Sequence, residues 1–246
     1  MRFVSPLKLV AGFALAALIA GNSQAGVVIE GFESGNLAAY TSTGSDTFFV
    51  SGADAHDGSF GLSASDSGDP GWIYRDDAGV QLQQGDSFSS WVRLNSSSLQ
   101  GGRAYFGFGA SAAGTLSLVL APNSGNLLFQ NNAGYHFHNI GTSIQNYTLD
   151  KWYLAEVDWA VGGALTGKLF DSDGTTLLNT VTANDNTITS GGIAFRSFPD
   201  SSFDTITKIN AASAVPEPGT ISLAFIAVGS ALFAARRRLR STQGVA

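Results

Sequence analysis

Between Val27 and Ile209, short runs of alternating hydrophobic and polar residues are separated by clusters of Gly, Asn, Asp, Ser and Pro. Alternation with a period of two is the pattern of β-strands with one buried face, and such clusters are typical of turns. The strands that this pattern predicts are 27–32, 48–50, 60–65, 72–74, 87–94, 104–110, 116–120, 126–131, 152–159, 165–170, 177–182, 192–198 and 203–209.

The longest runs also predict which side chains share a face. In 87–94, Phe88, Val92 and Leu94 lie on one side and Trp91 and Arg93 on the other. The same reasoning separates Ala104, Phe106, Phe108 and Ala110 from Arg103 and Tyr105, and Tyr153, Ala155, Val157 and Trp159 from Trp152, Leu154, Glu156 and Asp158.

This region contains no stretch with a helical period, and turn residues at 122–125 and 171–174 predict two hairpins. Short strands at this spacing predict an all-β domain over residues 26–210, built as a two-sheet antiparallel β-sandwich. A chain with 30 glycines and only 13% charged residues agrees with strands and turns.

Charge and cysteine content exclude several function classes. The net charge of −6 argues against a nucleic-acid partner, because phosphates are neutralised by a basic protein face. The chain of 246 residues has no cysteine, so disulfides and zinc–thiolate sites are excluded. Additional stability must come from the core or from a hard cation such as Ca²⁺.

The two ends of the chain differ from the central domain. Residues 1–25 combine Arg2 and Lys8, an apolar stretch from Leu9 to Ala20, and small residues before a cleavage point, which predicts a secretory signal peptide and processing by signal peptidase. A linker begins at residue 211 and leads to a second apolar segment near the C-terminus.

This C-terminal segment has three parts in a fixed order. A motif at 215–219 contains Val215, Pro216, Glu217 and Pro218, an apolar span follows at 220–235, and a basic end at 236–240 places cations on the cytoplasmic side. The prolines predict extended backbone before the span. An ordinary single-pass anchor is the alternative to a sorting signal. The cations of the basic end are Arg236, Arg237, Arg238 and Arg240.

The order and identity of these parts resemble the PEP-CTERM sorting tail. The resemblance implies that an exosortase processes the protein in the envelope of a Gram-negative bacterium. The tail would then cross the inner membrane only transiently, and the mature protein would reach the cell surface or an extracellular matrix of the kind found in exopolysaccharide-rich biofilms.

The central domain resembles the jelly-roll sandwiches of the concanavalin-like lectin and glucanase group and of carbohydrate-binding modules. The segments that carry the resemblance are Gly31–Gly35, Ala55–Phe60, Asp150–Tyr153, Asp171–Gly174 and Phe203–Ile206. In modules of this type a glutamate after the first strand and an aspartate in the last strand share a structural calcium ion. The resemblance therefore implies Ca²⁺ held by Glu33, Asp57 and Asp204.

Glu156 and Asp158 are the residues that most suggest catalysis. Alternation places both on one face, about 7 Å apart along the strand. They resemble the first half of the Glu-x-Asp-x-Glu strand of laminarinase-like glucanases, whose second glutamate is the general acid. Ala160 and Val161 stand where that glutamate should be, so we predict no catalytic residues and no enzyme activity.

Aromatic and charged side chains on alternating positions predict a glycan-binding face, because sugar rings stack on aromatic rings and hydrogen-bond to polar groups beside them. The predicted face consists of Trp91, Arg93, Arg103, Tyr105, Trp152, Glu156 and Asp158. Three functions stay open: a protein that binds polysaccharide without cleaving it, a glycan hydrolase or lyase, and a purely structural matrix protein.

Overall fold

The computed structural model describes residues 26–44, 47–65, 71–95, 102–198 and 200–209. The predicted signal peptide and sorting tail lie outside these residues. The chain divides between Asn210 and Ala211 into two units, and the described residues belong to the first of them. Within the ranges described, no helix has the length and apolar character needed to cross a membrane.

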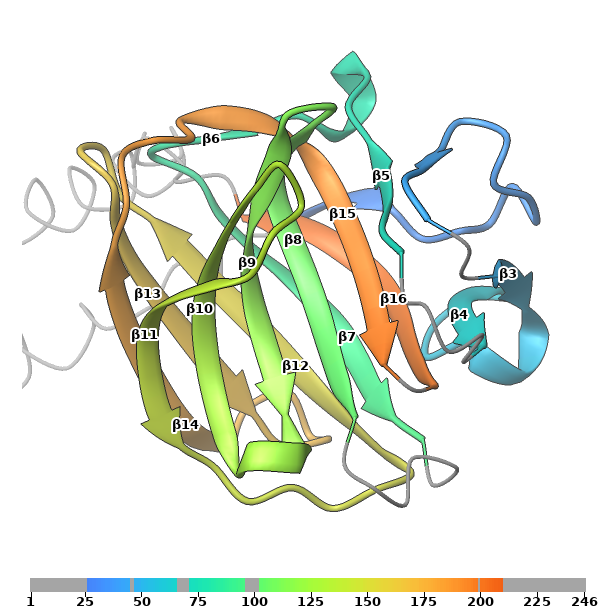
Figure 1. Ribbon diagram of the computed structural model, residues 1–246. Coiled ribbons are helices and arrows are strands. Elements are labelled where there is room, and N and C mark those ends of the chain that lie inside the picture. Colours follow the sequence, from blue (N-terminus) through green and yellow to red (C-terminus); the bar gives the residue numbers. More distant parts are fainter. Residues whose placement is uncertain (1–25, 45–46, 66–70, 96–101, 199, 210–246) are drawn as a thin grey trace, which may run out of the picture. The chain divides into compact units, whose positions relative to one another are not determined.

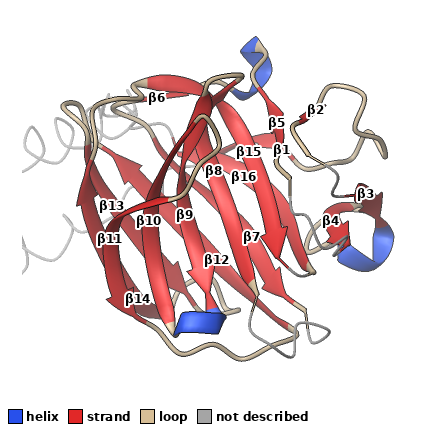
Figure 2. Ribbon diagram, viewed as in Figure 1, coloured by secondary structure: helices blue, strands red, loops and turns tan. Residues whose placement is uncertain are grey.

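The described residues form two antiparallel sheets that pack face to face (Figures 1 and 2). The front sheet, which faces the viewer in Figure 1, has the order β11-β10-β9-β8-β15-β5-β2, with β6 also paired to β15. The back sheet has the order β14-β13-β12-β7-β16-β4-β3, with β1 also paired to β16. The strands are β1 (Val27–Glu30), β2 (Thr41–Ser42), β3 (Thr47–Ser51), β4 (Gly61–Ser65), β5 (Ile73–Arg75), β6 (Leu82–Gln83), β7 (Ser87–Leu94), β8 (Arg103–Ser111), β9 (Gly114–Ala121), β10 (Asn126–Ala133), β11 (His138–Ile144), β12 (Lys151–Trp159), β13 (Ala164–Phe170), β14 (Leu177–Asn184), β15 (Ser190–Phe198) and β16 (Ser201–Ile209).

This architecture confirms the predicted two-sheet sandwich. Within the described ranges the helices are three single turns of 3₁₀ type: η1 (Gly52–Asp54), η2 (Ala78–Val80) and η3 (Pro122–Ser124). The sequence pattern missed β2, β6 and β11. The first two contain two residues each, and β11 is an edge strand without a clear alternation of hydrophobic and polar residues.

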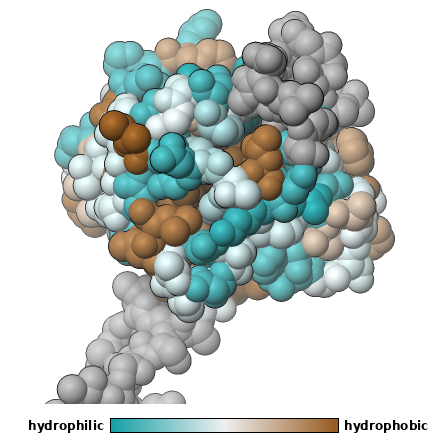
Figure 3. All heavy atoms as spheres, turned by 90° about the horizontal axis from the view of Figure 1, so that it is seen from below, coloured by the Kyte–Doolittle hydropathy of each residue, from teal (hydrophilic) through white to brown (hydrophobic). Residues whose placement is uncertain are grey.

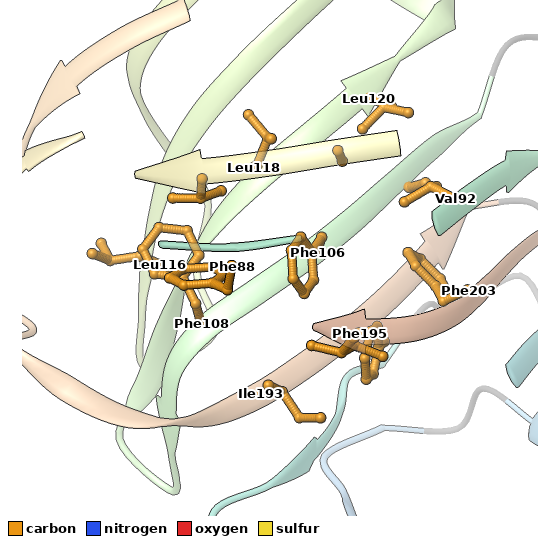
Figure 4. Close-up of a cluster of buried hydrophobic side chains, with 14 of the residues drawn as sticks. Phe88, Val92, Phe106, Phe108, Leu116, Leu118, Leu120, Ile193, Phe195 and Phe203 are labelled. Carbon is orange, nitrogen blue, oxygen red and sulfur yellow. The ribbon is translucent and has the colours of Figure 1, made fainter. Parts of the chain in front are cut away.

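The core lies between the sheets and is rich in aromatic rings (Figure 4). Phe88 of the back sheet packs against Phe106 and Phe108 of the front sheet, with ring centroids 5.9 and 5.1 Å apart. Trp159 at the end of β12 lies edge-on to Phe108 at 5.2 Å. Because the chain has no disulfides, burial of these large side chains is the main source of stability of the sandwich.

One predicted inner side chain points outward. Ala110 was expected to share the face of Phe106 and Phe108, but it packs with Tyr105 in a separate apolar cluster outside the core. The register of β8 shifts between Phe108 and Ser111, and Gly109 has a φ of 65°. This bulge inserts one residue and moves the following side chain to the other face, which alternation alone cannot predict.

The edge strands β11 and β14 close one side of the sandwich. The Ser143 hydroxyl donates to Asn179 Oδ1 at 2.9 Å, and the Asn179 amide donates to the Ile144 carbonyl at 2.8 Å. At Gly141 a Cβ would lie 2.4 Å from the Thr182 carbonyl oxygen, so the close approach requires glycine. On the face seen in Figure 3, separate apolar patches alternate with hydrophilic side chains.

Candidate functional site

The outer face of the back sheet is organised around a break in the pairing of β16. This strand pairs with β4 through Ser201–Phe203 and with β1 through Ile206–Lys208. Between these two partners Thr205 has a φ of 45°, an unusual conformation for a β-branched residue. The Asp204 side chain is fully buried at this break.

The carboxylate of Asp204 binds the loop between β3 and β4. Its Oδ2 accepts hydrogen bonds from the backbone amides of His56 at 2.7 Å and Asp57 at 2.9 Å, and its Oδ1 accepts from Thr205 N at 2.6 Å. Burial nevertheless raises the pKa of Asp204 above 3.8, because the three amides offset desolvation only in part.

Glu33 binds the other end of the same loop. Its Oε1 accepts from the amides of Ser59 at 2.9 Å and Phe60 at 3.2 Å. Gly58 lies between these contacts with a φ of 70°, and a Cβ there would lie 2.2 Å from Glu33 Oε1. One carboxylate from the turn after the first strand and one from the last strand therefore hold one short loop from both ends.

The predicted calcium ligands are placed near this loop but do not form a set of three carboxylates. The Asp57 side chain is 59% exposed and lies 3.1 Å from His56 Nδ1, while Asp57 contributes its backbone amide to Asp204. In the part of the chain that the structure describes, no group of three or more His, Cys, Asp or Glu side chains could hold a metal ion. Backbone amides donate to Glu33 Oε1 and to both carboxylate oxygens of Asp204.

The clamped loop places His56 on the aromatic residues of the sheet. The imidazole stacks on Trp91 with a centroid distance of 3.8 Å and an interplanar angle of 13°, and it lies edge-on to Trp152 at 5.2 Å. The guanidinium of Arg93 lies 5.1 Å from the centre of the Trp152 ring. At Gly174 a Cβ would be 3.3 Å from the Trp91 ring, so the β13–β14 turn also contacts this indole.

Arg93 also connects this aromatic group to the loop by charge. It donates to Asp54 Oδ1 at 2.7 Å, and the Ser202 hydroxyl donates to the same oxygen at 2.5 Å. Asp54 is only 7% exposed, so this ion pair is shielded from water. Charge-assisted hydrogen bonds of this kind are stronger than neutral ones and fix the position of the guanidinium over Trp152.

Glu156 and Asp158 share one lysine from the neighbouring strand. Lys168 Nζ lies 2.7 Å from Glu156 Oε1 and 2.7 Å from Asp158 Oδ2, and Ser87 donates to Asp158 Oδ1 at 2.6 Å. Burial alone would raise the pKa of Asp158, but the bonds from Lys168 and Ser87 outweigh it and hold this pKa below 3.8. The same pairs raise the pKa of Lys168 against the effect of its burial. This arrangement favours the charged forms of Asp158 and Lys168.

The seven residues of the predicted glycan-binding face do not lie on one sheet. Trp91, Arg93, Trp152, Glu156 and Asp158 share the outer face of the back sheet through the pairing of β7 with β12.

Arg103 and Tyr105 lie instead on β8 of the front sheet, where Tyr105 is 3% exposed and Arg103 donates to Asn123 Oδ1 at 3.1 Å. Alternation placed these seven side chains on the correct sides of their strands, but it carries no information on which sheet a strand joins.

Sequence reasoning also missed three members of the site. A hairpin centred on Gly162 places Glu156 opposite Lys168, so the lysine could have been found from the Gly162-Gly163 turn. His56 and Asp54 come from a loop whose return onto the sheet depends on Asp204, about 150 residues later.

Comparisons with known proteins bear on the C-terminal tail and on the fold of the sandwich. Residues 214–238 match the PEP-CTERM protein-sorting motif. The match indicates an exported protein with a C-terminal membrane-anchoring sorting signal. None of the curated proteins compared with this sequence matches it.

Among solved structures, a carbohydrate-binding module of Bacillus subtilis, CBM66, is similar with a TM-score of 0.53 and 14% identity, over 71% of this chain and 98% of that one. The cellulose-induced protein Cip1 has a TM-score of 0.48 and 16% identity, over 73% and 95% of the two chains. An endo-β-1,4-glucuronan lyase from the fungus Trichoderma reesei has a TM-score of 0.44 and 12% identity, over 74% and 95%.

The shared lysine gives a prediction for the titration of Asp158. In Lys168→Met the pKa of Asp158 should rise, because its burial remains and the opposing ion pair is lost. A carboxyl whose native pKa is depressed stabilises the fold above its unfolded pKa near 3.8 and loses this effect as the pH falls through the native value, so the variant should lose this contribution.

The measurement is a carboxyl-carbon NMR titration of both proteins. Lys151→Met is the matched control, because Lys151 pairs with Asp171 on the same sheet and should leave Asp158 unchanged. An equal rise in the pKa of Asp158 in both variants would mean that Lys168 does not control this pKa.

Proposed function

We propose that this protein is an exosortase-processed surface or extracellular-matrix protein of a Gram-negative bacterium, and that its sandwich binds polysaccharide without cleaving it. In this route signal peptidase acts at the N-terminus, the tail holds the protein briefly in the inner membrane, and exosortase then releases it. The sorting motif at residues 214–238 supports the exosortase step.

The main support for glycan binding is the arrangement of side chains on the outer face of the back sheet. Trp91 and Trp152 are both partly exposed, and the charged groups of Arg93, Glu156 and Asp158 lie on the same face. A sugar ring can stack its C–H groups on an indole while its hydroxyls bind carboxylates or a cation beside it. The fold similarity to a carbohydrate-binding module supports this proposal.

The carboxylates of this face favour binding over catalysis. Acid-catalysed cleavage of a glycosidic bond needs a protonated carboxyl, which enzymes obtain by raising its pKa. Asp158 has a lowered pKa and is bound to Lys168, which also binds Glu156. The position expected for a second acid holds Ala160, so we propose a role in hydrogen bonding to sugar hydroxyls.

The proposal is tested by measuring both binding and turnover of the mature protein on a polysaccharide panel. We expect saturable binding to at least one polysaccharide and no release of reducing ends. Trp152→Ala should weaken binding by roughly 2 kcal/mol, about 30-fold, as expected for a central aromatic contact. Glu156→Gln should weaken it by about 1–2 kcal/mol.

Phe49→Ala is the matched control, because this half-exposed ring lies on the same sheet but at its edge strand β3. Reducing ends released by the natural protein and lost in Glu156→Gln would establish a hydrolase, and unsaturated products would establish a lyase. Absence of binding to every polysaccharide would leave the purely structural function.

The sorting tail gives a second test, on intact protein from the native host. Mass spectrometry of the mature surface protein should find no peptide that contains Arg236–Arg240, because we expect the processing enzyme to cleave at the motif that contains Pro216 and Pro218. A strain without exosortase should retain these peptides. Full-length tail in the bulk of the surface protein would identify a permanent anchor.

We also propose that Ca²⁺ binds beside Glu33 and Asp204, since both hold the same loop and the Asp204 carboxyl group is buried there. If so, EDTA should lower the melting temperature, by about 2–4 °C for each kcal/mol of binding energy. Asp204→Asn should remove the effect of EDTA, whereas the exposed Asp76→Asn should retain it. An unchanged melt of the natural protein with EDTA would show that the backbone amides alone satisfy Asp204.

A further inference from the structure

The outer face of the front sheet carries a second apolar cluster, separate from the core of the sandwich. Outer faces of antiparallel sheets are normally in contact with water and polar. Here the face is formed by aromatic and small apolar side chains that are at most 9% exposed. They are Trp72, Tyr74, Tyr105, Ala110, Val119, Ala121, Leu128 and Ala194.

A short segment between β10 and β11, residues 134–137, covers part of this face, and we call it the strap. In Figure 1 this connection passes in front of the sheet. The Tyr135 ring lies 5.5 Å from Trp72 and 5.9 Å from Tyr74, and the Phe137 ring lies 6.0 Å from Tyr105. The rings of the strap therefore lie tilted against the aromatic rings of this face and cover part of them.

The strap is held by hydrogen bonds from neutral groups, among them the backbone amides of Gly134, Tyr135 and His136. Tyr135 has a φ of 62°, a strained conformation for a residue with a side chain. Its hydroxyl donates to the Ser111 carbonyl at 2.8 Å, and Asn132 donates to the His136 carbonyl at 2.7 Å. Phe137 is 53% exposed although it lies over the apolar cluster, with Arg196 4.6 Å from its ring centre. The covering is thus incomplete at its outer end.

Trp72 indicates that the covered face lacks a hydrogen-bond acceptor. The side chain is 2% exposed, and among the described residues its indole N–H has no hydrogen-bond partner. A buried N–H without an acceptor destabilises the protein by about 1–3 kcal/mol, so natural proteins rarely keep one. Tyr105 and Tyr135 border this indole, which places the free donor among the aromatic rings of the cluster.

Polar groups suited to sugar hydroxyls surround the cluster. The amides of Gln130, Asn132 and Asn139 form a connected row along β10 and β11, at 2.7 and 3.2 Å. A hollow of about 370 Å³ adjoins the start of the strap at Ala133 and is lined by the hydroxyl residues Ser111 and Thr187. Aromatic faces bordered by amides and hydroxyls are the chemistry that binds a saccharide.

We propose that the outer face of the front sheet is a second saccharide-binding site, which Tyr135 and Phe137 fill until a sugar chain displaces the strap. The sugar rings would stack on Trp72 and Tyr105, and a hydroxyl would accept the indole N–H of Trp72. This site is on the sheet opposite to the face of Trp91 and Trp152, so it is independent of the binding site in the proposed function.

Because the strap competes with the ligand, removing a ring of the strap should tighten ligand binding. A site that is open for only a fraction of the time has an apparent Kd raised by the inverse of that fraction. Tyr135→Gly suits the positive φ and removes the competing ring, so it should tighten binding to the front face by about tenfold or more. Adding Trp72→Phe, which keeps a ring and removes the N–H, should reverse this gain.

The experiment follows the four indole N–H signals of the mature protein by NMR during titration with cellohexaose, xylohexaose and laminarihexaose. The Trp72 signal is assigned by its loss in Trp72→Phe. We expect it to shift with at least one oligosaccharide, and at lower concentrations in Tyr135→Gly. A Trp72 shift that persists in Trp152→Ala would assign the binding to the front face even if the back face binds nothing.

Phe137→Ala serves as the second variant if Tyr135→Gly does not fold, since it trims a half-exposed ring and should also tighten binding. If the Trp72 signal stays unchanged with every oligosaccharide in the natural protein and in a folded strap variant, the cluster is a second structural core. Shifts at Trp91 and Trp152 alone would support the proposed function and reject this inference.

Discussion

The buried carboxylate of Asp204 is the interaction on which the back-sheet face depends. At this point β16 changes its partner from β4 to β1, so the regular ladder cannot satisfy the backbone amides of the nearby loop. Asp204 accepts from two of these amides and from Thr205 N. An ionised group that accepts several backbone hydrogen bonds can replace a missing strand at such a break.

The burial of Asp204 makes the stability of the fold depend on pH. Burial raises the native pKa of Asp204 above 3.8, so the native state holds this proton more tightly than the unfolded chain. The corresponding contribution to stability is complete below pH 3.8 and is lost as the pH rises through the native pKa. The Asp204 carboxyl group positions the loop between β3 and β4, and that loop places the imidazole of His56 on the Trp91 ring.

The fold was largely predictable from the sequence, whereas the site was predictable only in part. Alternation identifies the buried faces of β7 and β12 because one side of each strand faces the core and the other faces outward. It fails at Gly109, where a bulge exchanges the two sides, and for Tyr105, because strand sides do not reveal sheet membership. The contacts of Asp204 with His56 and of Arg93 with Asp54 join distant segments, so a local pattern cannot show them.

Both sheets carry aromatic residues on their outer faces, and in each case a loop covers part of them with rings of its own. The two covers differ in how they are held. The loop over the back sheet is fixed by Asp204, Glu33 and the Arg93–Asp54 ion pair, all of them charge-assisted. The strap over the front sheet is held by hydrogen bonds from neutral groups, and its backbone is strained at Tyr135.

Charge-assisted hydrogen bonds are about twice as strong as neutral ones, so the two faces should differ in their readiness to change. The back face is preorganised, and a ligand would meet Trp91, Trp152 and Arg93 already in place. On the front face, Tyr135 and Phe137 must first move away. The apparent affinity for a ligand is therefore lowered by the fraction of time that the strap covers the site. The same sandwich thus supports one face that is fixed before binding and one whose availability is set by its own loop.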